Sequence, residues 1–486
     1  MSVATPLPPL ITLEVRMSNV KLQFLYLPSA LLQARVLTFC MLASTLSGTS
    51  VGGTEIFVYQ SDEGIRMVEP DGTEVRQLKH KDRRSFFGGR GKWSPGGKYF
   101  AYASSEEDSN YPSVRLVQSD GKNDRFVAEG DFIGWSPRSD FLIYSTHGSE
   151  LVKGGGYQGR ASVTLNLFDI RQSKSVKIAD QMATRRDEPP LFSPDSKYIL
   201  YPLYNDPSNP CRWELYSVKD GEKSIVVQSL SQRDALAILC WLSDSSGFLV
   251  KRGLVLARSD SGGQQSEILL VKRLQTGRQE EPILTTGWLD RTGLVSLNPQ
   301  YKKAAYVAGK KGLRILDLET LSDTKVADGD FRFLDNFAAW SPDGKELAFA
   351  TDHVSITCAN GSGLRTIGTP ENCGRIDQIA WSPDNRFIAY RVMIVSVEHS
   401  KNGWVEKEQR AEVRLFSLSE GKEHVLVDDG SFGGWSKTGK HLCYQKRSGY
   451  EKRWPSVSGV YIADGSGHKS LLIGEGRLVE DSWSLK

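Results

Sequence analysis

Two glycine-containing motifs are the first candidates for chemistry in this chain. Residues 48–52 read Gly-Thr-Ser-Val-Gly, the pattern that presents a serine nucleophile on a sharp strand-to-helix turn. Residues 154–159 read Gly-Gly-Gly-Tyr-Gln-Gly, the glycine pattern of a dinucleotide-binding turn. The first motif lies in an N-terminal leader and the second lies between strand patterns, so both lack the strand–helix context that their chemistry needs. We therefore expect no catalytic site at either motif.

Metal or cofactor chemistry would need several liganding side chains that converge on one point. The seven histidines fall at scattered strand ends and loops, with no shared position in the repeat described below. The cysteines show no Cys-x-x-Cys or Cys/His spacing of the kind that binds zinc. We therefore expect no metal, no cofactor and no catalytic residue, and we favour a protein that is not an enzyme.

The first 53 residues have the order of an export signal. Arg35 precedes an apolar run at 36–46, and small residues follow at 47–50. Positive, apolar and small residues in this order are typical of a secretory signal. We expect residues 1–53 to be a leader, as a cleaved signal peptide, an uncleaved anchor or a disordered segment, with Met17 as an alternative start. The remaining protein would be periplasmic or extracellular, touching a membrane only through an uncleaved leader.

The composition favours a folded protein that is rich in strands and turns. Hydrophobic residues make up 39% and charged residues 24% of the 486 residues, as is usual for a globular domain. The 46 glycines, 11 tryptophans and 17 tyrosines suit many tight turns between strands. The formal net charge is only +3, so we expect no nucleic-acid partner, because such binding needs a strong positive field.

The six cysteines leave the disulfide question open. Cys358 and Cys373 flank one expected strand and could pair, and so could Cys211 and Cys240. The alternative is that the cysteines are small buried side chains with free thiols.

A five-residue motif repeats along the chain from residue 93 onward. It begins with tryptophan or another large apolar residue, usually continues with Ser-Pro and often has Asp in fourth place or Gly in fifth place. Proline presets the backbone for a turn, while aspartate and glycine tolerate the tight return, so the motif predicts a turn between two strands. The eight steps from residue 93 to residue 483 give a period of about 49 residues, typical of propeller blades. The units begin at Trp93, Trp135, Phe192, Trp241, Leu297, Trp340, Trp381, Trp435 and Trp483.

A second aromatic position follows the motif by nine residues. Among the complete units, only the one at Trp241 departs, with Val250 in this place. The residues that lead to it alternate in hydrophobicity, which predicts a strand after the turn. We expect the tryptophan on one strand and the aromatic residue on the next to pack between neighbouring sheets. The aromatic residues are Tyr102, Tyr144, Tyr201, Tyr306, Phe349, Tyr390 and Tyr444.

Each unit carries two further strand patterns, so the sequence predicts an all-β protein, a β-propeller of four-stranded antiparallel blades. Residues 55–78 supply the second, third and fourth strands of a blade, and the segment around Trp483 supplies a first strand alone. We expect these N- and C-terminal strands to pair and close the ring. The repeat count gives nine blades, with eight as the alternative if two units merge. Residues 54–486 would form this single domain.

The Trp-Ser-Pro-Asp-Gly turn at residues 340–344 and the aliphatic–aromatic strand after it resemble the repeat of the TolB family. The repeat is also similar to that in the propellers of prolyl-oligopeptidase-type peptidases, and the resemblance extends over residues 54–486. It implies a WD-type β-propeller, without the α/β domain that precedes the propeller in TolB. A family fold does not by itself imply an activity, because different sites are built on one fold.

Long insertions predict a binding face. In a four-stranded blade the second-to-third connections lie on the same face as the blade-to-blade connections, and repeat proteins commonly concentrate insertions on the face that binds. Nearly all the long insertions here join expected second and third strands. They span residues 104–112, 147–160, 204–212, 252–265, 396–409 and 446–455.

The candidate ligand-binding residues belong to this face. Acidic or amide residues four positions before the repeated motif, with nearby arginines, are expected to surround the mouth of the central channel. Exposed aromatic residues in the insertions are suitable interface anchors. The candidates are Asp131, Glu188, Asn336, Asp377, Arg186 and Arg375 at the mouth, with Tyr157, Trp404 and Trp454 in the insertions.

These observations favour a non-catalytic, TolB-like binding or scaffold module, expected to be a monomer, that holds a protein or glycan partner on its long-loop face. One alternative is a hydrolase or lyase that acts on a small molecule or sugar in the central channel. The other is the propeller component of a peptidase system.

Overall fold

The structure is a computed structural model that describes the chain in a series of segments. Every regular element within these segments is a β-strand, which confirms the predicted all-β class. The chain separates into two units, Met1–Thr54 and Glu55–Lys486. In the first unit, β1 (Thr12–Met17) pairs antiparallel with β2 (Val20–Leu25). The described residues are 12–17, 20–25, 55–79, 91–104, 112–151, 161–182, 189–203, 212–228, 235–254, 265–274, 277–287, 295–300, 302–307, 312–320, 322–328, 338–368, 373–400, 403–446 and 459–485.

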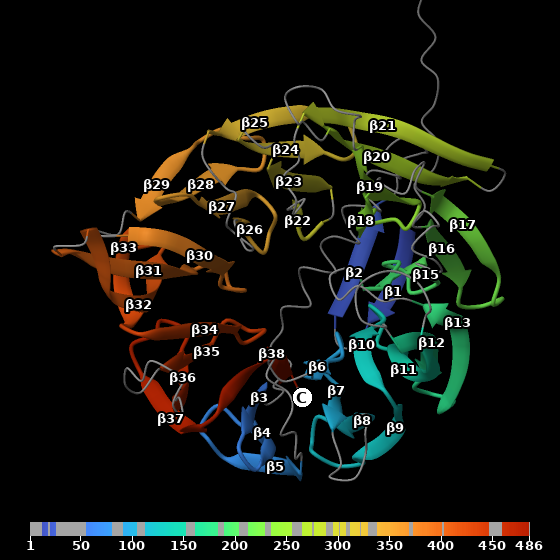
Figure 1. The fold of residues 1–486 in the computed structure, drawn as a ribbon, viewed down its shortest axis with the longest axis horizontal. Helices are drawn as coiled ribbons and strands as arrows, with labels where there is room; N and C mark the ends of the chain where they lie inside the picture. The colour runs from blue at the N-terminus through green and yellow to red at the C-terminus, as the bar shows by residue number, and fades with distance from the viewer. Residues whose placement is uncertain are drawn as a thin grey trace, which may run out of the picture. The chain divides into compact units, whose positions relative to one another are not determined.

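The second unit folds as a β-propeller, as the sequence predicted. Its described strands form nine four-stranded sheets, and neighbouring strands in each sheet are antiparallel. Figure 1 shows these sheets following one another around a common centre, with first strands toward the centre and fourth strands outside.

The strands of these sheets have the following bounds. Three sheets consist of β6 (Gly91–Trp93), β7 (Tyr99–Ser104), β8 (Ser113–Gln118) and β9 (Arg125–Glu129); of β10 (Asp131–Trp135), β11 (Phe141–Leu151), β12 (Ala161–Asp169) and β13 (Lys174–Met182); and of β14 (Leu191–Phe192), β15 (Tyr198–Leu203), β16 (Arg212–Ser217) and β17 (Lys223–Gln228). The next three consist of β18 (Ala235–Trp241), β19 (Gly247–Leu254), β20 (Gln265–Leu274) and β21 (Gly277–Gly287); of β22 (Val295–Leu297), β23 (Lys303–Val307), β24 (Leu313–Asp317) and β25 (Asp323–Ala327); and of β26 (Ala338–Trp340), β27 (Glu346–Ala350), β28 (Val354–Cys358) and β29 (Arg365–Gly368). The last three consist of β30 (Cys373–Trp381), β31 (Phe387–Ser400), β32 (Gly403–Ser417) and β33 (Lys422–Val427); of β34 (Gly430–Trp435), β35 (His441–Lys446), β36 (Gly459–Asp464) and β37 (Ser470–Glu475); and of β38 (Arg477–Leu485), β3 (Glu55–Ser61), β4 (Gly64–Val68) and β5 (Glu74–Lys79).

One sheet joins the two ends of the second unit. β38 pairs antiparallel with β3, and Trp483 lies opposite Phe57 with the ring centroids 5.0 Å apart. The N- and C-terminal strands therefore pair as predicted. Closure of all the sheets into one ring and a total of nine blades stay predictions.

A buried carboxylate also joins β3 to the neighbouring sheet that contains β34 and β35. Glu55 is 6% exposed, and its Oε2 lies 2.6 Å from Nδ1 of His441 in the neighbouring sheet. Thr438 also donates a hydrogen bond to Glu55. Burial opposes ionisation of the carboxyl, but these hydrogen bonds outweigh it and lower the pKa of Glu55.

The repeated Ser-Pro-Asp-Gly motif forms the turn between the first and second strands. In one unit the buried Ser341 accepts a hydrogen bond from the N–H of Glu346 at 3.0 Å and donates one to Asp343 at 2.7 Å. Gly344 has a φ of 67° and closes the turn by donating its N–H to the carbonyl of Ser341 at 2.8 Å. The left-handed backbone explains why small or amide residues occupy this place. In the six other units whose turns are described, they are Gly97, Ser139, Ser196, Ser245, Asn385 and Gly439.

The motif tryptophans connect neighbouring sheets. The indole Nε1 of Trp381 donates a hydrogen bond to the carbonyl oxygen of Ala339, the residue just before the motif of the preceding unit, at 2.8 Å. Three more tryptophans make the same contact with the preceding sheet. They are Trp135 to Lys92 at 3.0 Å, Trp241 to Leu191 at 3.3 Å and Trp340 to Ser296 at 2.9 Å. In these four units the motif therefore provides a contact between sheets as well as a turn within a sheet, whereas the indole N–H groups of Trp93, Trp435 and Trp483 are buried without a partner in the described segments.

In three of the sheets, the tyrosine at the second aromatic position belongs to a polar cluster that joins the second, third and fourth strands. The hydroxyl of Tyr306 on the second strand donates to Asp323 on the fourth strand at 2.9 Å, and Nε of Arg314 on the third strand lies 2.7 Å from the same carboxylate. Burial and the neighbouring aspartate raise the pKa of Tyr306, so its phenol stays protonated and can donate. Equivalent clusters comprise Tyr102, Arg115 and Asp124, and Tyr390, Arg414 and Glu423.

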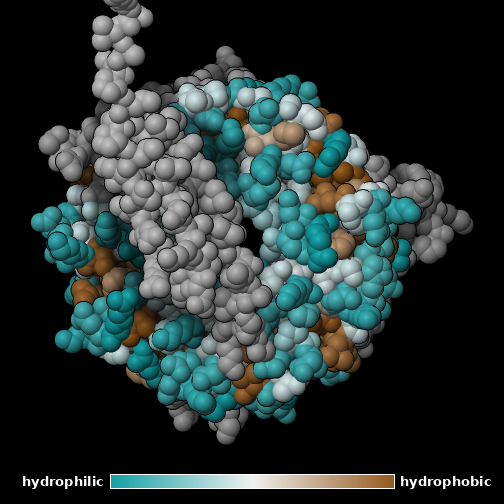
Figure 2. All heavy atoms as spheres, turned by 180° about the vertical axis from the view of Figure 1, so that it is seen from behind, coloured by the Kyte–Doolittle hydropathy of each residue, from teal (hydrophilic) through white to brown (hydrophobic). Residues whose placement is uncertain are grey.

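The fourth strands form the outer edges of the sheets. Each described pair of third and fourth strands contains a shift of register, and such bulges hinder edge-to-edge pairing between molecules. Figure 2 shows apolar residues on the visible face as separate clusters rather than one continuous patch. The exposed large apolar residues on or next to fourth strands are Phe126, Val176, Ile225, Leu364, Val425, Leu471 and Leu472.

Candidate functional site

Three of the residues predicted at the channel mouth lie in described first strands. Asp131 begins β10 and pairs with Ser145, whereas Asp377 lies at the bulge of β30. Arg375 lies two residues before Asp377 on the same strand. Because β10 bulges at Ile133 instead, the two acidic residues differ in register although each precedes its tryptophan by four positions. Glu188, Arg186 and Asn336 lie outside the described residues.

The predicted insertions are in part strands. β11 runs to Leu151 and pairs there with Ala161 at the start of β12, and β19 runs to Leu254. Residues 396–409, which we expected to be a loop, belong to β31 and β32 apart from 401 and 402, which lie outside the described residues. Tyr157 and Trp454 also lie outside the described residues, while Trp404 lies in β32 opposite His399.

The extended part of the β31–β32 hairpin, residues 395–409, is called the hairpin arm below. β31 and β32 have 14 and 15 residues, whereas most second strands have five or six. The described pairing of β30 with β31 ends at Ile394, and that of β33 with β32 ends at Val413. Beyond these points the two strands pair with each other as far as Ser400 and Gly403. The arm is therefore a two-stranded ribbon at the second-to-third connection.

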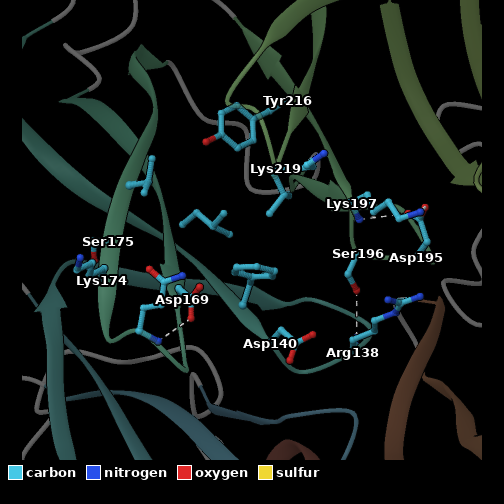
Figure 3. A pocket seen from close by; sticks show the side chains of 15 residues that line it. Arg138, Asp140, Asp169, Lys174, Ser175, Asp195, Ser196, Lys197, Tyr216 and Lys219 are labelled. Atoms are coloured by element: carbon cyan, nitrogen blue, oxygen red, sulfur yellow. Dashed lines mark hydrogen bonds and ion pairs between the residues drawn. The ribbon is translucent and has the colours of Figure 1, made fainter. Parts of the chain in front are cut away.

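A groove that we did not predict from the sequence lies between two neighbouring sheets. This inter-sheet groove has a volume of about 530 Å³ and separates sheet β10–β13 from sheet β14–β17. Figure 3 shows Lys174, Ser175 and Asp169 on one side of it, with Tyr216, Lys219 and Lys197 on the other. It lies on the face of the first-to-second and third-to-fourth turns, so it is on the opposite side of the blades from the hairpin arm.

The inter-sheet groove combines an apolar floor with charged walls. Leu167 and Tyr216 are 4% exposed, and Phe141 packs beside them. Burial raises the pKa of Tyr216, so its phenol stays protonated at neutral pH. Apolar floors with a few polar groups at the walls are typical of pockets that bind small molecules.

The described residues were compared with the needs of a metal site and of a reactive thiol. No group of three or more His, Cys, Asp or Glu side chains in the described segments could hold a metal ion. Cys240, Cys358 and Cys443 carry free thiols, so the pairings of Cys358 with Cys373 and of Cys240 with Cys211 were wrong. Burial raises the pKa of Cys240 and Cys443 to about 12, which keeps both thiols protonated.

Among the described residues, no helix is both long and apolar enough to cross a membrane.

Comparisons with known proteins support the fold. No family model matches the sequence, and no curated protein matches it. Among solved structures, Porphyromonas gingivalis dipeptidyl peptidase 4 matches with a TM-score of 0.53 at 13% identity, over 83% of this chain and 62% of that one. This chain thus spans about three-fifths of the peptidase. TolB from Acinetobacter baumannii matches at 17% identity over 71% of this chain and 83% of that one, with a TM-score of 0.29.

A third similar structure is an oligogalacturonate lyase in complex with manganese. It matches at 11% identity over 78% of this chain and 86% of that one, with a TM-score of 0.38. At these identities the likeness to the peptidase supports a β-propeller and assigns no activity.

Proposed function

We propose that this protein is a non-catalytic binding module that holds a protein partner on the face of its second-to-third connections, chiefly through the hairpin arm. The observation that carries the proposal is the run of paired residues from Val395 to Ser400 on β31, which has no flanking strand in the described segments. At about 3.3 Å per residue, these six positions extend the blade by roughly 20 Å.

The backbone of the hairpin arm suits a protein partner. Each outer edge of a two-stranded ribbon presents backbone N–H and C=O groups that can pair with an added strand. A two-stranded ribbon is only marginally stable in water by itself, so contact with a partner would stabilise it. The sequence of the arm contains Val395, Val397 and Trp404, residue types that bury well at interfaces. We infer that the partner contributes an extended segment to the ribbon.

Shortening the arm tests this proposal without disturbing the blade. Residues 396–408 are replaced by Asn-Gly, a two-residue hairpin turn, so that Val395 still pairs with Gln409. A matched control shortens the β20–β21 hairpin on the opposite face, with Asn-Gly in place of residues 273–278 between the paired Lys272 and Gln279. Both variants and the native chain are used to capture partners from an extract of the source cells, and the captured protein is then titrated as a purified component.

The proposal expects the purified partner to bind the native chain and the control with equal affinity, and the arm variant at least about tenfold more weakly, the effect of losing one or two interface hydrogen bonds. Equal affinity for all three chains would contradict it. Capture that is abolished when the extract is treated with a glycosidase would instead identify a glycan as the bound group.

We further propose that the protein acts outside the cytoplasm. The order of Arg35, the apolar run at 36–46 and the small residues at 47–50 supports export. N-terminal sequencing of the protein from cells tests this. A mature N-terminus near residue 54 is expected, and a protein that starts at Met1 or Met17 in the cytoplasmic fraction would contradict it.

A further inference from the structure

We propose that the inter-sheet groove binds a small organic acid, that is, a carboxylate attached to an apolar or aromatic body. This site is independent of the proposed partner site, because it lies on the opposite face of the blades. Three observations carry the inference: the balance of charges in the groove, its apolar floor, and a comparison with the equivalent groove between the two preceding sheets.

The carboxylates that line the groove already have partners. Asp140 lies 2.8 Å from Arg171, and Asp195 lies 3.4 Å from Lys197. Asp169 accepts backbone N–H groups from residues 171 and 172, each at 2.8 Å. Asp140 and Asp195 are thus each paired with a cation, while Asp169 is held by two backbone donors.

Three cations of the groove are not neutralised in this way. Among the described residues, Arg138, Lys174 and Lys219 have no carboxylate within ion-pair distance, and all three line the groove. Figure 3 shows Lys174 and Lys219 on opposite walls, with Arg138 at the lower end. An anionic group that enters the groove would meet positive charge from both sheets, which favours an acid over a base or a neutral molecule.

The preceding groove, between sheets β6–β9 and β10–β13, shows how such a space can be filled by the chain itself. Arg125 lines that groove, donates to the hydroxyl of Ser173 at 2.9 Å and to the carbonyl of Ile170 at 3.5 Å, and lies 5.7 Å from the ring centroid of Phe168. Its guanidinium group therefore bridges the two sheets and covers the aromatic ring of the second one.

The inter-sheet groove lacks this bridge because the equivalent residue is a valine. Arg125 pairs across its sheet with Leu116, and Val176 pairs in the same way with Leu167. Tyr216 holds the place of Phe168, since each lies two residues before a residue whose N–H donates to a carbonyl in the first-to-second turn of its own sheet. Val176 is 51% exposed, and its short apolar side chain has no donor with which to bridge the sheets.

The apolar and the charged residues of the groove therefore favour two parts of one ligand. Val176 and Val218 line the groove with Tyr216, and together they offer apolar and aromatic contact to the body of the ligand. The carboxylate would accept hydrogen bonds from Lys174 and Lys219 at the rim. At about 530 Å³, the groove falls within the usual range of small-molecule pockets.

Three probes with the same phenylbutyl body separate charge from apolar contact: 4-phenylbutanoate, 4-phenylbutanol and 4-phenylbutylamine. Binding to the purified native chain is measured by ligand-observed NMR and calorimetry. We expect the acid to bind at least about tenfold more tightly than the alcohol and the amine, the effect of one charge-assisted hydrogen bond. Affinity for the acid should fall as salt is raised, because the cations are exposed. Equal binding of the acid and the alcohol would overturn the proposal.

Substitutions test whether the acid binds in this groove. Val176→Arg, whose long side chain would occupy the apolar part of the groove as Arg125 occupies the preceding one, should abolish binding, and Lys174→Ser should weaken it about tenfold. The control is Lys422→Ser, because Lys422 begins β33 as Lys174 begins β13 but does not line the groove. Unchanged binding in Val176→Arg, with circular dichroism unchanged, would locate the probe elsewhere and refute the inference.

Discussion

Replacement of Trp381 by phenylalanine should destabilise the propeller more than the same change at Trp93. Both indoles are buried, with exposed fractions of 7% and 4%. Trp381 donates a hydrogen bond to the carbonyl of Ala339 in the preceding sheet at 2.8 Å, whereas Nε1 of Trp93 is buried without a partner in the described segments. The two substitutions remove the same side-chain volume, so their difference isolates the contact between sheets.

The size of this difference follows from the lost hydrogen bond. Loss of volume should cost each variant roughly 1–2 kcal/mol of unfolding free energy, a fraction of the cost of truncating a buried aromatic residue to alanine. Trp381→Phe also leaves the Ala339 carbonyl without its indole donor, at a further cost of about 1–3 kcal/mol. Trp93→Phe loses no such bond. We expect Trp381→Phe to be the less stable variant by about 1–3 kcal/mol.

Urea unfolding followed by far-UV circular dichroism measures this difference, because the signal reports mainly the sheets, whereas tryptophan fluorescence would change with the substitution itself. Trp340→Phe should behave like Trp381→Phe, since Trp340 makes the equivalent contact with Ser296 at 2.9 Å. Equal loss of stability in the Trp93, Trp340 and Trp381 variants would refute the view that the indole hydrogen bonds hold neighbouring sheets together.

Three further outcomes follow from the buried polar groups. The pKa of Glu55 lies below the reference value of 4.5, so ionised Glu55 stabilises the fold above about pH 4.5, and this stabilisation is lost as the pH falls through the folded pKa. Thermal unfolding between pH 3 and pH 7 should therefore show Glu55→Gln to be less stable than the native chain at neutral pH, with the difference disappearing in acid. Iodoacetamide at pH 8, followed by peptide mass spectrometry, should label the partly buried Cys358 before Cys443, whose thiol pKa is raised to about 12 by burial. Tyr306→Phe should lower the unfolding free energy in urea by about 1 kcal/mol, since Asp323 loses one of its donors, and a neutral result would count against the polar cluster.

The repeat could be predicted because its chemistry is local. Ser341, Asp343 and Gly344 form their turn through hydrogen bonds among residues within five positions of one another, so the motif itself specifies the geometry. The aromatic register follows from the same turn, since a fixed number of residues separates the turn from the aromatic position on the second strand. Such local patterns can be recognised in a single sequence without knowledge of the tertiary structure.

The hairpin arm was missed because most of its residues are polar, with Val395, Val397, Trp404 and Val405 as the apolar exceptions. The segment around Glu398 and Glu406 reads as a solvated insertion, yet the two residues lie on strands that pair in register. With so few apolar residues in the segment, hydrophobic alternation gives only a weak signal for a strand. The backbone N–H and C=O groups of the arm pair across the hairpin, whereas those of a loop would bond to water.

The inter-sheet groove was missed because it depends on residues of different units. Val176 and Arg125 occupy equivalent places, but this is visible only after each fourth strand has been aligned with its third strand across a bulge. The relative placement of the residues predicted at the channel mouth could not be predicted either, because it also depends on where each strand bulges. Asp131 and Asp377 share their spacing to tryptophan, and a bulge at a different residue places them in different registers.

Photo-crosslinking in the source cells tests the central claim most directly. A benzoylphenylalanine residue is introduced at Trp404 on the hairpin arm or at Asp220, an exposed turn residue on the opposite face, and the cells are irradiated. The account predicts a discrete crosslinked protein from the Trp404 position and none from the Asp220 position. The same crosslinks from both positions, or none from Trp404 when the protein is correctly folded and exported, would contradict a partner site on the hairpin arm.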